Sequence, residues 1–418
     1  MKPNWSKQKL GAVADLCLGK MLDQKKNKGE YHPYLGNIHV RWGTFNLEDL
    51  PQMRFESHEH DRYGLMRGDL VVCEGGEPGR CALWNDQVPS MKFQKALHRV
   101  RPHSCLDSRY LLYWFIHAGK RNVLNQYCTG STIKHLPGEK LAIVEVDVPP
   151  LPIQRRIGSI LSAYDELIEN NTRRIQILER MAQALYREWF VNFRFPGHAQ
   201  VKLVASPLGK IPQGWEVQPL ESFCGTITDG SHFSPKSVED GLPMASVKDM
   251  HDFGINVESC RKISREDFDA LVRADCKPLL GDVLIAKDGS YLKHTFVVEK
   301  ELDLVVLSSI AILRPVPEKV RPHFLALCLR DPSVSERMKG LVSGVAIPRI
   351  VLKDFRKFNV VLPPFHIQQE WADVVEPIVG LCCKLIDKNA NLRRTRDLLL
   401  PKLISGALDV SKLDIETV

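Results

Sequence analysis

Apolar residues recur at alternating spacings of three and four over a long central stretch of the chain, which is the pattern of a coiled-coil seam. The seam positions are Leu161, Tyr164, Ile168, Asn171, Ile175, Leu178, Ala182, Leu185, Trp189 and Asn192. Charged residues fill the other positions, as on the solvent side of a helix. The pattern predicts a long helix over residues 151–195, and Asn171 is expected to help fix its register.

A second apolar stripe lies near the end of the chain. Its members are Val374, Ile378, Leu381, Leu385, Leu392 and Leu399. The stripe predicts a helix over residues 365–407, followed by a tail over 408–418. Because it is the only other long stripe, we expect the two helices to pack against each other. A whole domain must lie between the end of one helix and the start of the other, so antiparallel packing closes the chain most economically.

Each predicted helix follows a segment of mixed character. In the first segment, residues 1–150, short β-branched runs alternate with helical patterns such as RYLLYWFIHAG. The second segment covers residues 215–364. Each segment ends in a Pro-Pro pair, which stops a strand and pre-sets φ for a first helical turn. We predict two mixed domains of the α/β (α+β) class, and a linker rich in Pro and Gly over residues 196–214.

The two halves of the chain are copies of one module. TGSTIKHLPGEKLAIVEVDVPPLPIQ, residues 129–154, aligns without a gap on SGVAIPRIVLKDFRKFNVVLPPFHIQ, residues 343–368, at a shift of 214. Upstream, GDLVVCEGG at 68–76 matches GDVLIAKDG at 281–289. Between these islands the halves diverge. The chain is therefore predicted to be an internal pseudo-two-fold repeat.

Composition indicates an ordinary globular protein. Of the 418 residues 44% are hydrophobic, and no apolar run approaches the roughly 20 residues of a membrane span. The first residues, MKPNWSKQKL, lack the apolar core of a signal peptide, so we expect a cytoplasmic location and no membrane partner. The 11 cysteines form no CxxC pair, which favours reduced, mostly buried thiols over a metal site.

The net charge of +7 suits a polyanionic partner. Basic residues of the mixed domains are predicted to fall largely in loops punctuated by Gly, Ser and Asp, where phosphate contacts and base readout are commonly made. We predict double-stranded DNA as the partner, with contacts from Arg80, Lys92, Lys95, Arg99, Arg101, Lys134, His135, Lys236, Lys248, Lys287, Lys293, His294 and Arg349. A helix of about 40 residues is about 60 Å long, and a B-DNA turn is about 34 Å. Two readers held by such helices imply a two-part target.

No catalytic constellation is found in the chain. HEHD at 58–61 lacks the HExxH spacing of a zinc site, and GGEPGR at 75–80 lacks the GK[ST] ending of a phosphate-binding loop. LPPF at 362–365 has a twin in VPPL, which identifies it as a helix start. Asp23-Gln24-Lys25 matches only the tail of a nuclease element. We therefore predict no catalytic residue and no metal site, and a chain that binds rather than catalyses.

Several motifs together resemble the specificity subunits of type I restriction-modification systems. PLPIQRRIGSILSAYDELIENNTRRIQILERMAQALYREWFVNF resembles the central conserved helix of that family, and LRRTRDLLLPKLISGAL its distal one. PLGKIPQGWEVQPL resembles the entry into its second recognition domain, and TDGSHFSPKSVEDGLPMASVKDM with GDVLIAKDG resembles one common type of that domain. Where the family often carries Gln after Gly-Ser-Thr, this chain has Ile133 and Ile347.

The resemblance implies two target recognition domains, each reading half of a split DNA sequence, spaced by antiparallel coiled-coil helices. It also implies that these helices dock two modification subunits, which bind S-adenosylmethionine and methylate adenine. Restriction subunits are then expected to supply ATP-driven translocation and cleavage with Mg²⁺. None of these cofactors is expected on this chain. Because the two domains differ outside the repeated islands, we predict an asymmetric target.

Two other classes of function stay open on the sequence. A self-contained methyltransferase or nuclease would bind S-adenosylmethionine or cut DNA without partners, although the chain lacks a glycine-rich cofactor loop. A coiled-coil scaffold would bind protein partners with no response to duplex DNA or salt. A DNA-binding subunit would bind duplex DNA with a strong salt dependence.

Overall fold

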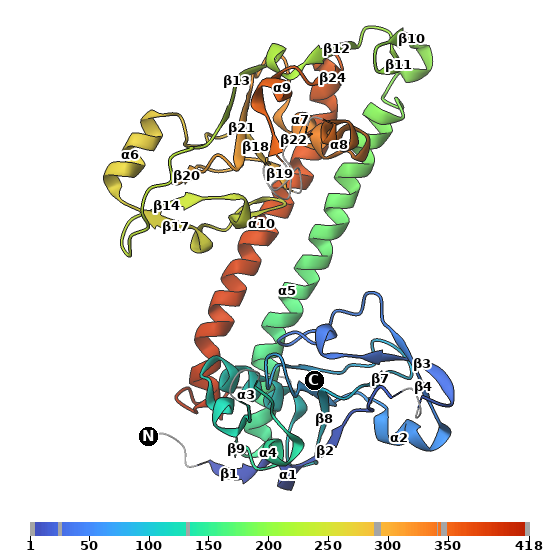
Figure 1. The fold of residues 1–418 in the computed structure, drawn as a ribbon, viewed down its shortest axis with the longest axis vertical. Coiled ribbons are helices and arrows are strands. Elements are labelled where there is room, and N and C mark those ends of the chain that lie inside the picture. Colours follow the sequence, from blue (N-terminus) through green and yellow to red (C-terminus); the bar gives the residue numbers. More distant parts are fainter. Residues whose placement is uncertain are drawn as a thin grey trace. The chain divides into compact units, whose positions relative to one another are not determined.

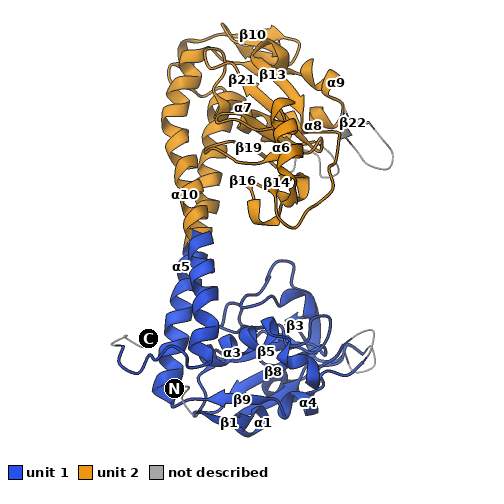
Figure 2. Ribbon diagram, turned by 90° about the vertical axis from the view of Figure 1, so that its left-hand side faces the viewer, with its two compact units in different colours: residues 1–170, 389–418 blue, residues 171–388 orange. Residues whose placement is uncertain are grey.

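The computed structural model describes residues 5–23, 27–130, 134–287, 294–340, 342–343 and 349–413, with backbone alone at 342–343 and 349–350. The chain forms two compact units, residues 1–170 with 389–418 and residues 171–388 (Figure 2). Both units contain parts of the two long helices, α5 (Leu151–Tyr186) and α10 (Phe365–Ile404). Each unit therefore joins one mixed domain to a segment of each helix.

The first mixed domain is built on a four-stranded antiparallel sheet. Its order is β2 (Ala14–Leu18), β8 (Leu97–Pro102), β5 (Leu70–Cys73) and β6 (Cys81–Leu83). A second sheet has β3 (Glu30–Leu35) in the centre, antiparallel to β4 (Gln52–Phe55) and parallel to β7 (Lys92–Phe93). β1 (Ser6–Lys9) pairs with β9 (Glu145–Val148), which ends at the first Pro-Pro stop.

Short helices connect these strands. They are α1 (Leu10–Val13), η1 (Asn37–His39), η2 (Ser57–Glu59), α2 (His60–Tyr63), α3 (Ser108–Lys120), η3 (Val123–Tyr127) and α4 (Gly138–Ala142). Asp107 caps α3, because its Oδ1 accepts a 2.9 Å hydrogen bond from the Tyr110 N–H. The apolar face of α3, including Leu111 and Phe115, is buried in the core of the first unit. The helical pattern RYLLYWFIHAG, residues 109–119, lies within α3, which confirms the predicted helix.

The second domain repeats this topology (Figure 1). Its four-stranded sheet has the order β13 (Cys224–Asp229), β21 (Ile310–Pro315), β18 (Val283–Ala286) and β19 (Thr295–Val297). In the second sheet β14 (Leu242–Ala245) is antiparallel to β17 (Arg261–Ile263) and parallel to β20 (Val305–Val306). β12 (Glu216–Pro219) pairs with β24 (Asn359–Leu362). The predicted mixed class and internal repeat are therefore confirmed in the fold.

The remaining elements of the second unit lie in its connections. They are η6 (Leu220–Ser222), η7 (Val247–Asp249), β15 (Met250–His251), β16 (Gly254–Ile255), η8 (Val257–Ser259), α6 (Arg265–Arg273), α7 (Pro322–Arg330), α8 (Pro332–Lys339), β22 (Val342–Ser343), β23 (Arg349–Ile350) and α9 (Leu352–Arg356). α7 occupies the place of α3: it follows the long strand β21 as α3 follows β8.

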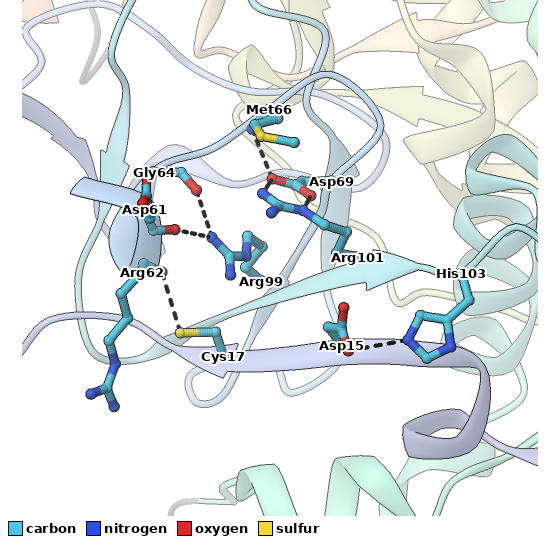
Figure 3. A network of polar contacts seen from close by, with 10 residues as sticks. All are labelled: Asp15, Cys17, Asp61, Arg62, Gly64, Met66, Asp69, Arg99, Arg101 and His103. Carbon is cyan, nitrogen blue, oxygen red and sulfur yellow. Dashed lines mark hydrogen bonds and ion pairs between the residues drawn. The ribbon is translucent and has the colours of Figure 1, made fainter. Parts of the chain in front are cut away.

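One buried ion pair is conserved between the two domains. Asp69 accepts hydrogen bonds from Arg101 Nε at 2.7 Å and Nη2 at 2.8 Å (Figure 3), and Asp282 accepts them from Arg314 at 2.9 and 3.0 Å. Each aspartate follows a glycine with positive φ, +94° at Gly68 and +85° at Gly281, a conformation that favours glycine. The repeated Gly-Asp thus forms a tight turn whose carboxylate is satisfied by two nitrogens of one guanidinium.

A second repeated device joins each domain to the helix that follows it. Gln154 is fully buried; its Oε1 accepts from Asp107 N at 2.8 Å, and its Nε2 donates to Pro149 O at 2.8 Å and Cys105 O at 3.0 Å. Gln368 does the same with Arg321 N, Pro363 O and Lys319 O. The Gln of the repeated Ile-Gln pair therefore satisfies backbone groups that no regular element pairs.

Replacing Gln368 by alanine is expected to lower the free energy of unfolding of the second unit by about 2–4 kcal/mol, because three buried backbone groups lose their partner. Denaturant unfolding followed by hydrogen exchange at α7 measures the effect. The matched control is Gln369→Ala on the same helix, whose amide contacts only the exposed Asp373. Equal losses in the two variants would contradict the role assigned to Gln368.

Within each unit the two long helices run antiparallel, as predicted. In the first unit Ile157 and Leu161 share a core with Leu400 and Leu403, and Asn389 Nδ2 donates to Ile168 O at 3.3 Å. In the second unit the Tyr186 and Trp371 rings lie 6.2 Å apart, while Cys382 Sγ lies 4.0 Å from Ile175 O. In both units, residue numbers increase along α5 in the direction in which they decrease along α10.

The seam of α5 agrees with the prediction up to Trp189, and the prediction is wrong at Asn192, which is exposed after the helix ends. Leu161, Ile168, Asn171 and Ala182 are buried, and Tyr164, Ile175, Leu178, Leu185 and Trp189 are partly buried. After Tyr186 the helix passes into a π-helical turn, Arg187–Val191, closed by a 2.8 Å bond from Asn192 N to Arg187 O. This turn buries Phe190 more deeply than Trp189.

The predicted stripe of α10 is wrong at Leu381 and Val374, whose side chains are 37% and 50% exposed. The seam instead follows Trp371, Val375, Ile378, Cys382, Leu385, Asn389, Leu392, Arg396 and Leu399, none of which is exposed. Asn389 and Arg396 belong to it because each has a partner on α5, Ile168 O and the Asp165 carboxylate respectively. A search for apolar residues skips Asn389 and Arg396 because they are polar, and it selects Leu381 in place of the neighbouring Cys382.

The predicted linker and the described part of the tail also have defined structure. The predicted linker contains a hairpin of β10 (Leu203–Ser206) and β11 (Gly209–Pro212). In the tail, Val410 is buried in the core of the first unit, and Ser411 O accepts a 2.7 Å bond from Arg156. All 11 cysteines are free and seven are buried, as predicted.

Among the described residues, no helix is long and apolar enough to cross a membrane, and no group of three or more His, Cys, Asp or Glu is placed to hold a metal ion. HEHD forms the end of η2 and the start of α2.

Candidate nucleic-acid interface

In the first domain the loops that follow β2 and β5 meet the loop that precedes β8. Lys20 N donates to Phe93 O at 3.1 Å, Lys95 N donates to Lys20 O at 2.7 Å, and Glu74 N donates to Ala96 O at 2.9 Å. We call this surface, formed by residues 19–22, 74–77, 94–96 and 134–135, the first loop face. His135 belongs to it because it forms a bridge with Gly75, and the next residue, Leu136, donates its N–H to Glu74 O at 2.7 Å.

The second domain forms the same surface with the same backbone bonds. Ser231 N donates to Val306 O at 2.9 Å, Ser308 N to Ser231 O at 3.0 Å, and Lys287 N to Ser309 O at 2.9 Å. We call residues 230–236, 246–248, 287 and 307–309 the second loop face. η7 joins it because Val247 N donates to Ser309 Oγ at 3.2 Å.

Glycines make the close approach of these loops possible. A Cβ atom on Gly19 would lie 2.2 Å from Gln94 O, and one on Gly230 would lie 2.1 Å from Val306 O. Both distances are far below van der Waals contact, so neither position tolerates a side chain. The first strand of each four-stranded sheet therefore leads into a turn of the same backbone shape.

Equivalent positions in this common frame carry different side chains. The pairs are Lys20 and Ser231, Glu74 and Lys287, Lys95 and Ser308, and Ala96 and Ser309. Ala96 holds a φ of +90°, a conformation strained for a residue with a Cβ. Because the backbone bonds are the same at each pair, the chemical differences between the faces reside in the side chains.

Buried ion pairs support both faces. In the first domain Lys20 Nζ lies 2.5 Å from Glu59 Oε2 and donates to Arg54 O at 2.9 Å. Burial opposes ionisation of Glu59, but hydrogen bonds from Lys20 and the Glu56 N–H outweigh it and lower its pKa. In the second domain Lys287 Nζ lies 2.5 Å from Asp229 Oδ2, which also lies 3.3 Å from His232.

Some of the predicted contact residues form a first group that is exposed, and the others have partners within the protein. Lys95, Lys134, His135, Lys236 and Lys248 are exposed on the loop faces. Arg80 is half-buried; it donates to Asn37 O at 3.0 Å and lies 3.2 Å from Glu77 Oε2. His294 pairs with Asp252 at 2.9 Å. Exposure leaves the first group available to a phosphate or a base edge.

The prediction of solvent-facing loop residues is wrong for Lys92, Arg99, Arg101 and Lys287. Lys92 lies on β7 and Arg99 on β8, both buried, and burial lowers the pKa of each. Lys92 Nζ donates to His60 O at 3.3 Å, and Arg99 Nη1 donates to Asp61 O and Gly64 O at 3.2 and 2.7 Å (Figure 3). They satisfy carbonyls of α2 and of Gly64, which directly follows it.

Arg101 forms an ion pair with Asp69, and Lys287 forms one with Asp229. The predicted contacts at Lys293 and Arg349, and the departures at Ile133 and Ile347, lie outside the described residues or side chains.

Sequence reasoning missed His232, Ser308 and Ser309, which the fold brings to the loop faces. A usable signal was present in Gly19 and Gly230, which end equivalent strands and mark the same close approach. That signal is weak without the structure, because the strands around the two glycines share little sequence.

The long helices carry exposed apolar side chains as well. Leu167 on α5 is 47% exposed and Leu381 on α10 is 37% exposed, and the two positions are related by the repeat shift of 214. Ile177 and Met181 are further exposed residues of α5, and Val374 and Leu398 of α10. Each helix therefore has an apolar face that the intramolecular seam does not use.

Known proteins share this arrangement. The chain is 27% identical over 359 residues to the specificity subunit of the type I restriction enzyme MjaIX of Methanocaldococcus jannaschii, covering 83% of this chain and 79% of that one. The EcoBI specificity subunit of Escherichia coli is 25% identical over 365 residues, covering 83% and 75%. A crystal structure of the type I restriction-modification S subunit from M. genitalium superposes with a TM-score of 0.60 at 18% identity over 96% of both chains.

The match to a family model follows the internal repeat. The model of the type I restriction modification DNA specificity domain matches residues 2–180 and again residues 212–392, so that each copy contains one mixed domain and most of its helix. With both halves matched, the chain belongs to the family of type I restriction-modification specificity subunits.

Proposed function

We propose that this chain is the DNA-reading subunit of a type I restriction-modification complex and binds an asymmetric, bipartite double-stranded target. Each mixed domain reads one half-site through its loop face. One observation carries the proposal: the two faces share one hydrogen-bonded backbone frame yet differ at positions that remain accessible, Lys95/Ser308 and Ala96/Ser309. A shared frame with different side chains presents the same docking geometry and a different pattern of donors and acceptors.

The exposed lysines and His135 suit the phosphate backbone, which supplies most of the affinity and positions the protein on the duplex. The residues that differ in the frame suit base edges, which carry the sequence information. Identical readers related by a two-fold axis would specify a palindrome. Different readers specify two unrelated half-sites.

The helices are proposed to dock two modification subunits. The repeat places an exposed leucine at the same position of both helices, Leu167 and Leu381, so one apolar docking surface is offered twice. In this proposal the modification subunits bind S-adenosylmethionine and methylate adenine. Restriction subunits, recruited through them, bind ATP and Mg²⁺. The chain itself contributes no catalytic residue.

Mapping of methylated adenines tests the proposal. The chain is co-expressed with its modification subunits in cells free of other adenine methylation, and the modified sites are aligned. We expect one split motif with two different halves and a fixed spacer, and no methylation without this chain. A symmetric or unsplit motif would contradict the proposal. Binding of S-adenosylmethionine by the purified chain alone would support a self-contained enzyme instead.

A further inference from the structure

The turn after the first strand of each four-stranded sheet places one residue in the same position of both domains. Gly19 N donates to Leu97 O at 3.0 Å, and Gly230 N donates to Ile310 O at 3.1 Å. Lys20 and Ser231, which directly follow these glycines, are then held in the same way by the backbone bonds described above. Leu22 and Phe233 are each the third residue after the glycine. They therefore correspond by their distance along the chain from the same fixed turn.

Both of these side chains are large, apolar and exposed. Leu22 is 61% exposed and Phe233 is 64% exposed. A single exposed apolar residue is common on a protein surface and needs no explanation. Here two divergent domains, which carry Lys20 against Ser231 and Met21 against His232, keep a large apolar side chain at the same place in the frame.

The surroundings of these side chains indicate the chemistry of what covers them. On the first loop face the nearby exposed residues include Lys95, Lys134 and His135, and on the second they include His232 and Lys236. Exposed basic residues beside protruding apolar side chains, Leu22 with Met21 in the first domain and Phe233 in the second, match a duplex, in which charged phosphates flank apolar base surfaces. Thymine methyl groups and unstacked base steps are the usual partners of Leu and Phe in such interfaces.

We propose that Leu22 and Phe233 are apolar DNA-contact residues, one in each domain, and that each packs against base pairs of the half-site read by its own domain. The proposal rests on the proposed function and assigns it a matched pair of specificity-determining residues. Because leucine and phenylalanine differ in width and flatness, the equivalent contacts select different base steps.

The test uses the chain in complex with its modification subunits and a fluorescein-labelled duplex that carries the split target obtained from methylation mapping. The variants are Leu22→Ala and Phe233→Ala. Matched controls are Met66→Ala and Leu279→Ala, exposed apolar residues that also correspond under the repeat and precede β5 and β18, at the other end of the same sheets. Circular dichroism melting confirms that all four variants fold.

We expect Leu22→Ala and Phe233→Ala each to weaken binding of the duplex by about tenfold or more, the usual cost of one lost base contact. Methylation mapping should show relaxed sequence preference only in the half-site of the altered domain, with the other half unchanged. The two controls should bind as the parent complex does. Their alanine substitutions remove similar apolar surface away from the loop faces.

Binding and methylation patterns equal to those of the parent would overturn this inference while leaving the proposed function intact, because the parent complex would still modify its split target. Loss of modification subunits from either variant would also overturn it, since the side chain would then contact protein rather than DNA. A parent complex that modifies no split target would instead refute the proposed function.

Discussion

Replacing Leu167 and Leu381 together by aspartate is expected to abolish assembly with the modification subunits, and each single substitution is expected to leave one subunit bound. Both leucines are exposed and related by the repeat, so each belongs to one of two equal apolar surfaces. A carboxylate buried in either interface without a partner costs about 3 kcal/mol or more, roughly a hundredfold in affinity. Mass photometry of the purified complexes gives the number of bound subunits.

The matched control is Gln176→Asp on α5. Gln176 is exposed and, at 100° per residue, lies on the side of the helix opposite Leu167. This variant should keep both modification subunits, because the added charge stays in solvent. Single variants that bind two subunits, or a double variant that still methylates DNA, would show that docking does not depend on the repeated leucines.

The second unit is expected to lose about 3 kcal/mol of stability as the pH rises from 7 to 10, because of a buried histidine. His323 on α7 lies 2.7 Å from Glu299 and 3.4 Å from Glu376 of α10, and Arg321 lies 2.5 Å from Glu376. Burial by itself lowers the pKa of His323, but the two carboxylates together outweigh it and raise the pKa to about 9. The same contacts lower the pKa of Glu376.

The direction of the effect follows from the two states of His323. Its pKa is higher in the folded chain than the ordinary value of 6.5, so the stabilisation is fully present below about pH 6.5 and is lost as the pH rises through about 9. The difference between the folded pKa of His323 and its ordinary value, about two to three pH units, corresponds to about 3 kcal/mol of stability. Hydrogen exchange at α7, measured between pH 7 and 10, follows this loss after correction for intrinsic exchange rates.

A comparison of two histidine variants isolates His323 from other titrations. His323→Gln should be destabilised at pH 7, since two partly buried carboxylates lose their shared cation, and its stability should then change little up to pH 10. His366→Gln, on the exposed side of α10, should keep the pH dependence of the parent. The same decline in all three proteins would place its origin in other groups.

The arrangement of elements could be predicted because it depends on short-range patterns. The spacing of Leu161, Ile168 and Ile175 is enough to specify a helix with one buried side, and the two Pro-Pro pairs mark where strands stop and helices start. The seam of α10 was harder to predict. Asn389 and Arg396 are polar, and only their partners on α5 make their burial favourable.

The candidate contacts were predicted with less success, for a physical reason. Charge in a sequence shows that a residue can bind an anion, but not whether a carbonyl or carboxylate of the same protein binds it first. Arg99 and Lys92 are held by α2 carbonyls, and Arg101 by Asp69. Lys134 and Lys248 carry the same charge and remain in solvent. The difference depends on contacts between residues 30 or more positions apart.

The sequence by itself determined that the chain is a repeat of a mixed domain and a long helix, because periodicity and self-similarity are properties of the order of residues. Only the tertiary structure decided which side chains the two copies present in common and which they present differently. Backbone bonds between distant loops align Lys20 with Ser231 and Lys95 with Ser308. Packing, which depends on all three dimensions, determines which of the repeated positions remain exposed to a partner.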